Sequence, residues 1–170
     1  MKSFLIIDGY NIINSWSALQ DRAQYSMEEA REKLIEMLAN YKAYKGVEVI
    51  IVFDGHLVKG NSGTKRTINE IKVVFTKEHQ TADSYIEKRV YQLSRLHFVQ
   101  VATSDWAEQQ TVLSSGGTRI SARELEKEVM FAQSRMRKRY LNQKHGFNNI
   151  THGLDPHILK KLEQWRRRKD

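Results

Sequence analysis

Four short apolar runs, rich in β-branched residues, constrain the fold of this chain most strongly. They occupy residues 3–8 ("SFLIID"), 47–54 ("VEVIIVFD"), 71–76 ("IKVVFT") and 97–105 ("HFVQVATSD"). Runs of this length and composition predict strands, and the near-continuous apolar ones are typical of parallel strands that are covered on both faces. A short fifth strand is predicted over 117–120 ("GTRI").

Helical patterns lie between these runs. Ser26 with Glu29 and Ser121 with Glu124 form capping boxes, and Gly46 ends the first of the two helices. Further helices are predicted over 81–96 and after the Asp155-Pro156 pair, whereas 55–69 and 142–153 are predicted to be loops. Alternating strands and helices predict an α/β fold with three layers, α/β/α, around a mostly parallel Rossmann-like sheet of 4–5 strands.

Composition limits the class of protein. A chain of 170 residues with 40% hydrophobic and 28% charged residues is expected to form one globular domain, here over 1–141, with a loop and a basic helix over 142–170 packed on it or extending it. No apolar run approaches the roughly 18 residues of a membrane span, so no membrane partner is expected. The absence of cysteine excludes disulfides and zinc–thiolate sites, and a cytoplasmic location is the simplest interpretation.

The positive charge is concentrated at the C-terminal end. Residues 134–170 hold eleven of the 28 Lys and Arg but only three of the 20 Asp and Glu, so this segment accounts for the whole net charge of +8. A basic tail on a neutral body indicates a polyanionic partner such as a nucleic acid, and the alternative is a solvated helix face.

Carboxylates follow the predicted strands. Asp8, Asp54 and Asp105 each end an apolar run, and Asp83 opens the helix after the run at 71–76. The carboxyl ends of parallel strands share one edge of a sheet, where ligands bind in such folds. Clustered carboxylates repel each other and need a cation, and oxygen ligands favour Mg²⁺ or Mn²⁺.

Each acid also has a purely structural explanation. Asp83 suits the first turn of a helix, Asp54-Gly55 is a common turn pair, and Asp105 suits a helix start. It is their convergence on one edge that favours a metal site. Next to Asp8, Gly9 lets the backbone turn and Asn11 can direct its amide toward a water or a phosphate oxygen.

Four motifs in this order resemble the NYN domain, a branch of the PIN-like nucleases, and most closely its YacP-like subfamily. They are "DGYN" (8–11), "VIIVFDG" (49–55), "TADSYIE" (81–87) and "VATSD" (101–105), and the similarity extends to "SAREL" (121–125) and "WRRR" (165–168). The resemblance implies a PIN-like fold and a Mg²⁺- or Mn²⁺-dependent endoribonuclease, a hydrolase that acts in mRNA decay with the ribosome as a partner.

The resemblance also assigns the residues of the site. Asp8, Asp83, Asp105 and Asn11 match the catalytic positions, the three acids being metal ligands, and Asp54 matches a second-strand acid whose part in metal binding varies. The expected chemistry is hydrolysis of the phosphodiester bond, leaving a 5′-phosphate and a 3′-hydroxyl.

RNA must be held by residues outside this acidic site. The candidates are basic: Lys59, Lys65, Arg66, Arg135, Arg137, Lys138 and Arg139. Tyr10 and Trp106 adjoin the acids and either stack on bases or pack in the core.

Three other interpretations stay open. His56 and His79 lie near the acids in the sequence and suit metal-free acid–base cleavage of RNA. An Asp8 nucleophile would make the protein a phosphatase, although position 10 is Tyr where such phosphatases of the haloacid-dehalogenase type have a second acid. A module that binds RNA or the ribosome but does not cleave is the third. No GxGxxG turn follows Asp8, which excludes dinucleotide binding. No small-molecule cofactor is expected.

Overall fold

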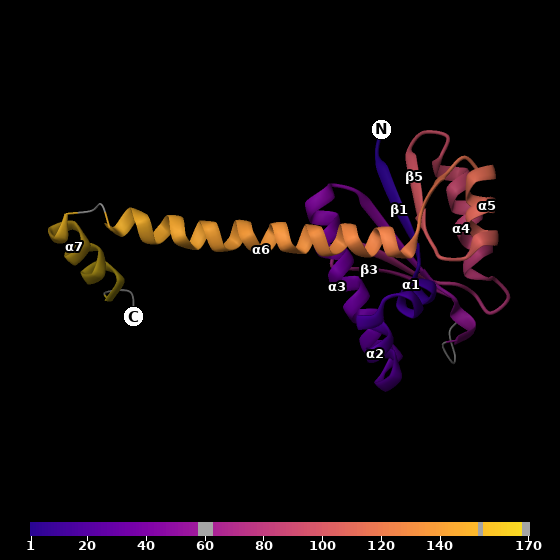
Figure 1. Cartoon of the computed structure of the whole chain (residues 1–170), viewed down its shortest axis with the longest axis horizontal. Helices are drawn as coiled ribbons and strands as arrows, with labels where there is room; N and C mark the ends of the chain where they lie inside the picture. The colour runs from indigo at the N-terminus through magenta and orange to yellow at the C-terminus, as the bar shows by residue number, and fades with distance from the viewer. Residues whose placement is uncertain (58–62, 153–154, 168–170) are drawn as a thin grey trace. The chain divides into compact units, whose positions relative to one another are not determined.

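The computed structural model describes residues 1–57, 63–152 and 155–167 of the chain (Figure 1). The chain divides into two compact units, Met1–Gln133 and Ser134–Asp170. The strands are β1 Ser3–Asp8, β2 Glu48–Phe53, β3 Thr64–Ile68, β4 Ile71–Phe75, β5 Phe98–Ala102 and β6 Thr118–Ile120. The helices are α1 Gly9–Ser15, α2 Ser17–Tyr25, α3 Met27–Lys45, α4 Ala82–Leu93, α5 Trp106–Ser114, α6 Ala122–His152 and α7 Pro156–Arg167.

The six strands form one sheet in the order β3-β4-β2-β1-β5-β6. All neighbours are parallel except β3, which is antiparallel to β4. Asp8 at the end of β1 pairs with Val52, and Phe53 pairs with Phe75, so β1, β2 and β4 end at the same edge. The predicted α/β class and mostly parallel sheet are confirmed.

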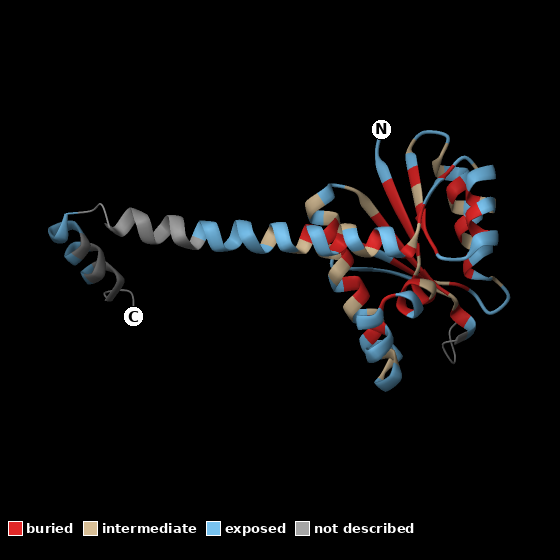
Figure 2. Cartoon of the chain, in the orientation of Figure 1, coloured by how far each residue is buried: buried red, intermediate tan, exposed pale blue. Residues whose placement is uncertain are grey.

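Side chains on each strand alternate between two apolar cores. In β1, Leu5 and Ile7 pack with α1, α2, α3 and the first part of α6, whereas Phe4 and Ile6 pack with α4 and α5 on the other face. The helices therefore cover both faces of the sheet (Figure 1), and the buried residues follow the strands and the helix faces turned toward them (Figure 2). This alternation has the period of two expected for a pleated strand.

The structure confirms the helix starts and the helix end that were predicted from capping residues. The Ser26 hydroxyl accepts from the Glu29 N–H at the start of α3, and Gly46 ends that helix with a φ of 70°. Ser121 and Glu124 form a complete capping box at the start of α6, since each side chain accepts from the other residue's backbone N–H.

The loop predicted over 55–69 is wrong in its last part. Residues 64–68 form β3, joined to β4 by Asn69 and Glu70, which both have positive φ, as in the tight turns that favour right-twisted hairpins. Exposed polar residues fill most of this edge strand, so it lacks the apolar run by which the other strands were recognised. Residues 58–62, with Lys59, lie outside the described residues.

Gly9 is needed for packing, not for a turn. It is the first residue of α1, and a Cβ added there would lie 2.2 Å from Cε1 of Phe53. The Phe53 ring is fully buried and stacks on Phe75 with ring centroids 5.3 Å apart, so it has little freedom to move away.

Gly9→Ala is therefore expected to destabilise the protein by about 1–3 kcal/mol through overpacking. Chemical denaturation of Gly9→Ala, Phe53→Leu and the double variant measures this, because a smaller side chain at 53 should make the alanine less costly. An equal cost of Gly9→Ala in both backgrounds would show that the Phe53 contact is not the cause.

The second unit, Ser134–Asp170, is helical where it is described. Helix α6 continues through 142–152, so the loop predicted there is wrong for these residues. The Asp155 side chain accepts from the His157 N–H at 2.9 Å, as predicted for a helix that begins at Pro156. Among the residues described, no helix has the length and apolar character to cross a membrane.

Candidate metal and active site

The fold brings the strand-end acids to one edge of the sheet. Asp8 and Asp54 follow the adjacent parallel strands β1 and β2, and Asp105 follows β5, the other neighbour of β1. Asp83 lies in the first turn of α4. The negative charges of Asp54 and Asp105 raise the pKa values of both Asp8 and Asp83, as expected for acids that lie near one another.

Three carboxylates form the centre of this site. Asp8, Asp83 and Glu108 each offer a carboxylate oxygen, and these oxygens lie within 4.8 Å of one another. Glu108 lies in the first turn of α5 and was not among the residues predicted from the sequence. Of the predicted ligands, Asp8 and Asp83 belong to this cluster, whereas Asp54 and Asp105 lie around it.

Glu108 is the most buried member of the cluster. Its side chain is only 5% exposed, and neither carboxylate oxygen has a hydrogen-bond partner in the described part of the chain. Burial is the main cause that raises its pKa to about 8, and the nearby Thr103 hydroxyl opposes this rise while the charges of Asp8 and Asp83 add to it.

The pKa values of Asp8 and Asp83 are also raised. Burial raises the pKa of Asp8 to about 6, the backbone N–H of Asn11 opposes the rise, and the Asp83 charge adds to it. Burial and the charges of Asp105 and Asp54 raise the pKa of Asp83. The carboxyl groups of Asp8 and Glu108 are thus held where ionisation is costly, and the exposed carboxyl of Asp83 lies beside them, as expected where a cation compensates their charge.

Asp105 and Asp54 have local hydrogen-bond partners. Asp105 is the N-cap of α5, where its Oδ1 accepts from the Ala107 N–H at 2.8 Å and from the Glu108 N–H at 3.4 Å. Asp54 Oδ1 accepts from the His56 N–H at 3.3 Å and lies 2.5 Å from His56 Nδ1. The structural explanations of these two acids therefore hold alongside their electrostatic role.

Asn11 fixes the segment that precedes α5. Its Oδ1 accepts from the Ser104 N–H at 2.7 Å and from the Ser104 hydroxyl at 2.9 Å. The backbone N–H of Asn11 meanwhile donates to Asp8 at 3.4 Å. Asn11 thus joins the end of β1 to the start of α5, and so positions two elements that carry acids of the cluster.

The sequence pattern at 105–108 explains why Glu108 was missed. An Asp N-cap followed by Glu three residues later is typical of a capping box, in which Glu108 would accept from the Asp105 N–H. In the structure the Thr103 hydroxyl accepts from that N–H instead, at 3.1 Å. Glu108 therefore takes no part in capping and its carboxylate joins Asp8 and Asp83.

The donor set fits a hard divalent cation. Three carboxylates with converging oxygens supply only oxygen ligands, which suits Mg²⁺ or Mn²⁺. The unpartnered, buried carboxylate of Glu108 is the feature that such an ion would explain, because a buried charge without a partner is costly.

The predicted basic and aromatic residues fall in different places. Lys65 and Arg66 lie exposed on β3, and the basic residues of the second unit are exposed on α6: Arg135, Arg137, Lys138 and Arg139. Tyr10 is buried and its hydroxyl accepts from Arg31, so it packs in the core. Trp106 is 70% exposed beside Asp105, so the core-packing interpretation of Trp106 is wrong.

A mostly parallel sheet covered by helices on both faces, with acids converging at its carboxyl edge, places the chain in the class of PIN-like α/β domains. The sequence profile of the YacP-like NYN domain matches residues 5–167. The chain belongs to this family, which supports a nuclease-like, RNA-related function.

Known relatives agree with this assignment. The chain is 42% identical over 166 residues to the YacP protein of Bacillus subtilis (strain 168), with 96% of each chain covered. The crystal structure of Rae1 (YacP) from Bacillus subtilis is similar at 41% identity with a TM-score of 0.75, covering 96% of this chain and 94% of that one. A variant of that protein with one Trp-to-Leu substitution gives a TM-score of 0.73 at 40% identity over 85% of both chains.

Proposed function

We propose that this protein is a Mg²⁺- or Mn²⁺-dependent endoribonuclease that cleaves mRNA in the cytoplasm, in association with the ribosome. The observation that carries the proposal is the convergence of Asp8, Asp83 and the buried, unpartnered Glu108 within 4.8 Å. Membership of the YacP-like NYN family supports the choice of RNA over other phosphate esters as the substrate.

Each acidic residue has a proposed role. Asp8, Asp83 and Glu108 would hold the divalent ion, which when bound would polarise the scissile phosphate and lower the pKa of a water molecule. Asp105 keeps the first turn of α5 in place, so that Glu108 faces Asp8. Asp54 adds negative charge near Asp8 and Asp83, which raises the pKa of each.

The basic second unit supports the ribosome as a partner. Residues 134–170 account for the net charge of +8, and the exposed cations Arg137, Lys138 and Arg139 follow one another along α6. A cationic surface of this kind attracts phosphate backbones whatever their sequence, and ribosomes present RNA backbone over much of their surface.

The proposed function is tested by incubating the purified protein with RNA, alone and on translating ribosomes, in Mg²⁺ or Mn²⁺. Internal cuts that carry 5′-phosphates are expected, and they should be more frequent on ribosome-bound mRNA. A chromogenic phosphate ester tests the Asp-nucleophile phosphatase. Retention of intact RNA by the protein under all of these conditions would instead favour a non-cleaving binding module.

Trp106 provides a separate prediction about substrate contact. Its side chain is 70% exposed at the start of α5, next to Asp105, and is placed to stack on an unpaired base near the acids. Trp106→Ala is expected to raise KM for RNA about fivefold or more, because base stacking on aromatic residues contributes about 1–3 kcal/mol per base.

Thermal unfolding provides the control for this variant, since an exposed substitution should change stability by less than about 0.5 kcal/mol. Phe98→Ala, at an exposed aromatic residue that begins β5, is the matched substitution away from the acids. An unchanged KM in Trp106→Ala, or an equal rise in Phe98→Ala, would contradict a specific contact.

A further inference from the structure

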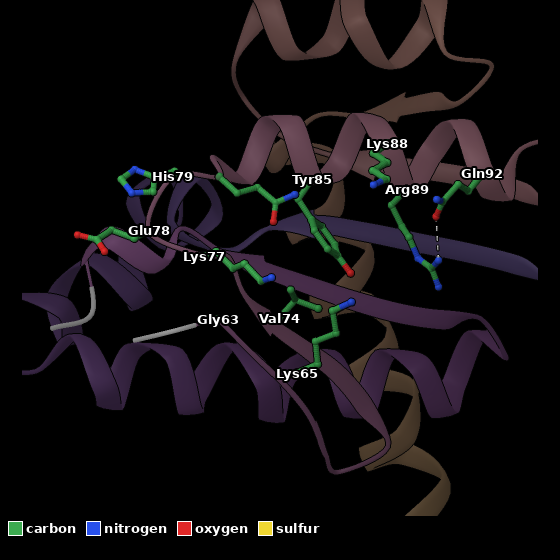
Figure 3. Close-up of a pocket in the computed structure, with 11 residues that line it drawn as sticks. Gly63, Lys65, Val74, Lys77, Glu78, His79, Tyr85, Lys88, Arg89 and Gln92 are labelled. Atoms are coloured by element: carbon green, nitrogen blue, oxygen red, sulfur yellow. Dashed lines mark hydrogen bonds between the residues drawn. The ribbon is translucent and has the colours of Figure 1, made fainter. Parts of the chain in front are cut away.

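A basic groove lies between α4 and the edge strands of the sheet. It has a volume of about 930 Å³, and the residues that define it come from α4, from the strands and from the segment between them: Lys65, Val74, Lys77, Tyr85, Lys88 and Arg89. We name it the α4–β3 groove. Figure 3 shows Tyr85 and Arg89 extending from α4 toward the side on which Lys65 and Val74 lie on the strands, with Lys88 on the same helix.

The charged residues that line the groove are mostly positive. Lys65, Lys77, Lys88 and Arg89 line it together with a single acid, Glu78. None of these four cations forms an ion pair within the described part of the chain. A second recess of about 320 Å³ shares Lys65 and Arg89 and continues the positive lining to Arg66 and Lys72. The cations are thus available to an anionic ligand that extends along the groove.

An aromatic ring lies among these cations. Tyr85 is half-buried on α4, and Lys65 Nζ lies 5.6 Å from the centroid of its ring. Cations that follow a backbone, combined with an aromatic face on which a base can stack, are the features by which proteins bind single-stranded nucleic acid. An acidic peptide would use the cations but has no need of the ring.

Part of the lining of the α4–β3 groove lies at the edge of the sheet where the acids lie. Phe75, the last residue of β4, pairs with Phe53, the last residue of β2, so Lys77 and Asp54 follow their strands at the same edge. Asp83 and Tyr85 are both in the first turn of α4, on different sides of the helix. A strand bound along the groove would therefore reach the acidic cluster around the N-terminal end of α4.

We infer that the α4–β3 groove binds single-stranded RNA and directs it to the acidic cluster. This inference rests on the proposed function for the identity of the ligand, and it adds Lys77, Tyr85, Lys88 and Arg89 to the residues that contact the substrate. On this account β3 forms one wall of the substrate path, which gives the hairpin of β3 and β4 a role in binding.

The test measures binding of a fluorescent single-stranded RNA by anisotropy over a range of salt concentrations. All variants carry Asp8→Asn, so that cleavage does not interfere, and all are full-length. Lys88→Ala/Arg89→Ala is the groove variant. Arg22→Ala/Lys33→Ala removes the same charge from α2 and α3, which cover the opposite face of the sheet.

The groove variant is expected to bind at least about fivefold more weakly at low salt, and the slope of log Kd against log[salt] should fall by about 1.4, since each phosphate contact on a single strand contributes about 0.7. The control variant should keep the parent slope. Tyr85→Leu should weaken binding with the slope unchanged, because stacking involves no counterion release.

Several results would contradict the inference that the groove binds single-stranded RNA. They are an unchanged salt slope in the groove variant, an equal loss of affinity in the control variant, and no RNA binding by the parent protein. Tighter binding of duplex RNA or of an acidic peptide than of single-stranded RNA would also contradict it. Cleavage is measured separately, in proteins that retain Asp8. If the groove variant loses RNA binding but the protein that retains Asp8 cuts no RNA, the proposed nuclease function is contradicted and the inference that the groove binds RNA is kept. If the protein that retains Asp8 cuts RNA but the groove variant binds RNA normally, the proposed nuclease function is kept and the inference about the groove is contradicted.

Discussion

Asp8→Asn is expected to lower the rate of RNA cleavage by about a thousandfold or more and to leave the fold intact. Asp8 ends β1 in the middle of the sheet and contributes one of the three converging oxygens. A bound metal supplies several kcal/mol of transition-state stabilisation, and each 1.36 kcal/mol changes the rate tenfold. The amide can still accept from the Asn11 N–H, so the start of α1 should be kept.

Asp83→Asn should give a loss of the same order, and Asp21→Asn is the matched control because it removes an exposed carboxylate on α2. The measurement is kcat for a defined RNA, with circular dichroism to establish folding. Near-normal cleavage by folded Asp8→Asn protein would contradict the proposed site.

Glu108→Gln is expected to remove most of the loss of stability that the metal-free protein shows at alkaline pH. The pKa of Glu108 is raised from 4.5 to about 8, so the folded state holds this proton more tightly than the unfolded state. The resulting stability is fully present below about pH 4.5 and is lost as the pH rises through about 8. A pKa shift of this size corresponds to a loss of up to about 5 kcal/mol in the free energy of unfolding. Glu108→Gln avoids this loss, because its amide stays neutral.

Thermal unfolding at pH 5 and pH 8.5 in EDTA measures this effect. The wild-type protein should lose more stability between pH 5 and pH 8.5 than Glu108→Gln does. In both proteins Asp8 adds a smaller loss of stability as the pH rises through about 6, because its pKa is also raised in the folded state. Addition of Mg²⁺ at pH 8.5 should raise the Tm of the wild-type protein but have little effect on the variant.

Glu87→Gln is the control for this measurement, because Glu87 is an exposed acid on α4 and should respond as the wild-type protein does. If Glu108→Gln and Glu87→Gln show the same pH profile and the same response to Mg²⁺, Glu108 is not part of a cation site.

The convergence of the acids was predictable because it follows from topology. An apolar, β-branched run identifies a buried strand, and parallel strands end at one edge, so Asp8, Asp54 and Asp105 meet there once the order of elements is known. No contact had to be known in advance. The helix that begins after Thr81 places Asp83 at the same edge by the same rule.

The choice among these acids was not predictable, because it depends on hydrogen bonds between neighbouring residues. Thr103 accepts from the Asp105 N–H and thereby frees Glu108 from a capping role that its spacing suggests. Whether a helix-start acid caps or faces the site is decided by one hydroxyl, and the sequence pattern is the same in both cases.

Strand β3, which we propose as one wall of the substrate path, was missed for a different reason. Strand β3 is polar, and its turn is Asn69-Glu70, not the Asn-Gly pair by which such hairpins are usually recognised. Gly9 was assigned to a turn because glycine is common there, whereas its actual requirement comes from Phe53, a residue distant in the sequence. Tertiary contacts of this kind have no local signal.

The measurement that tests the central claim most directly is analysis of the RNA ends left by the purified protein, with and without EDTA. The account predicts that cleavage needs Mg²⁺ or Mn²⁺, stops in EDTA, and leaves a 5′-phosphate and a 3′-hydroxyl, because the acids of the cluster act through a bound cation. Cleavage that continues in EDTA and leaves a 2′,3′-cyclic phosphate would contradict it and favour acid–base catalysis by a histidine such as His56 or His79.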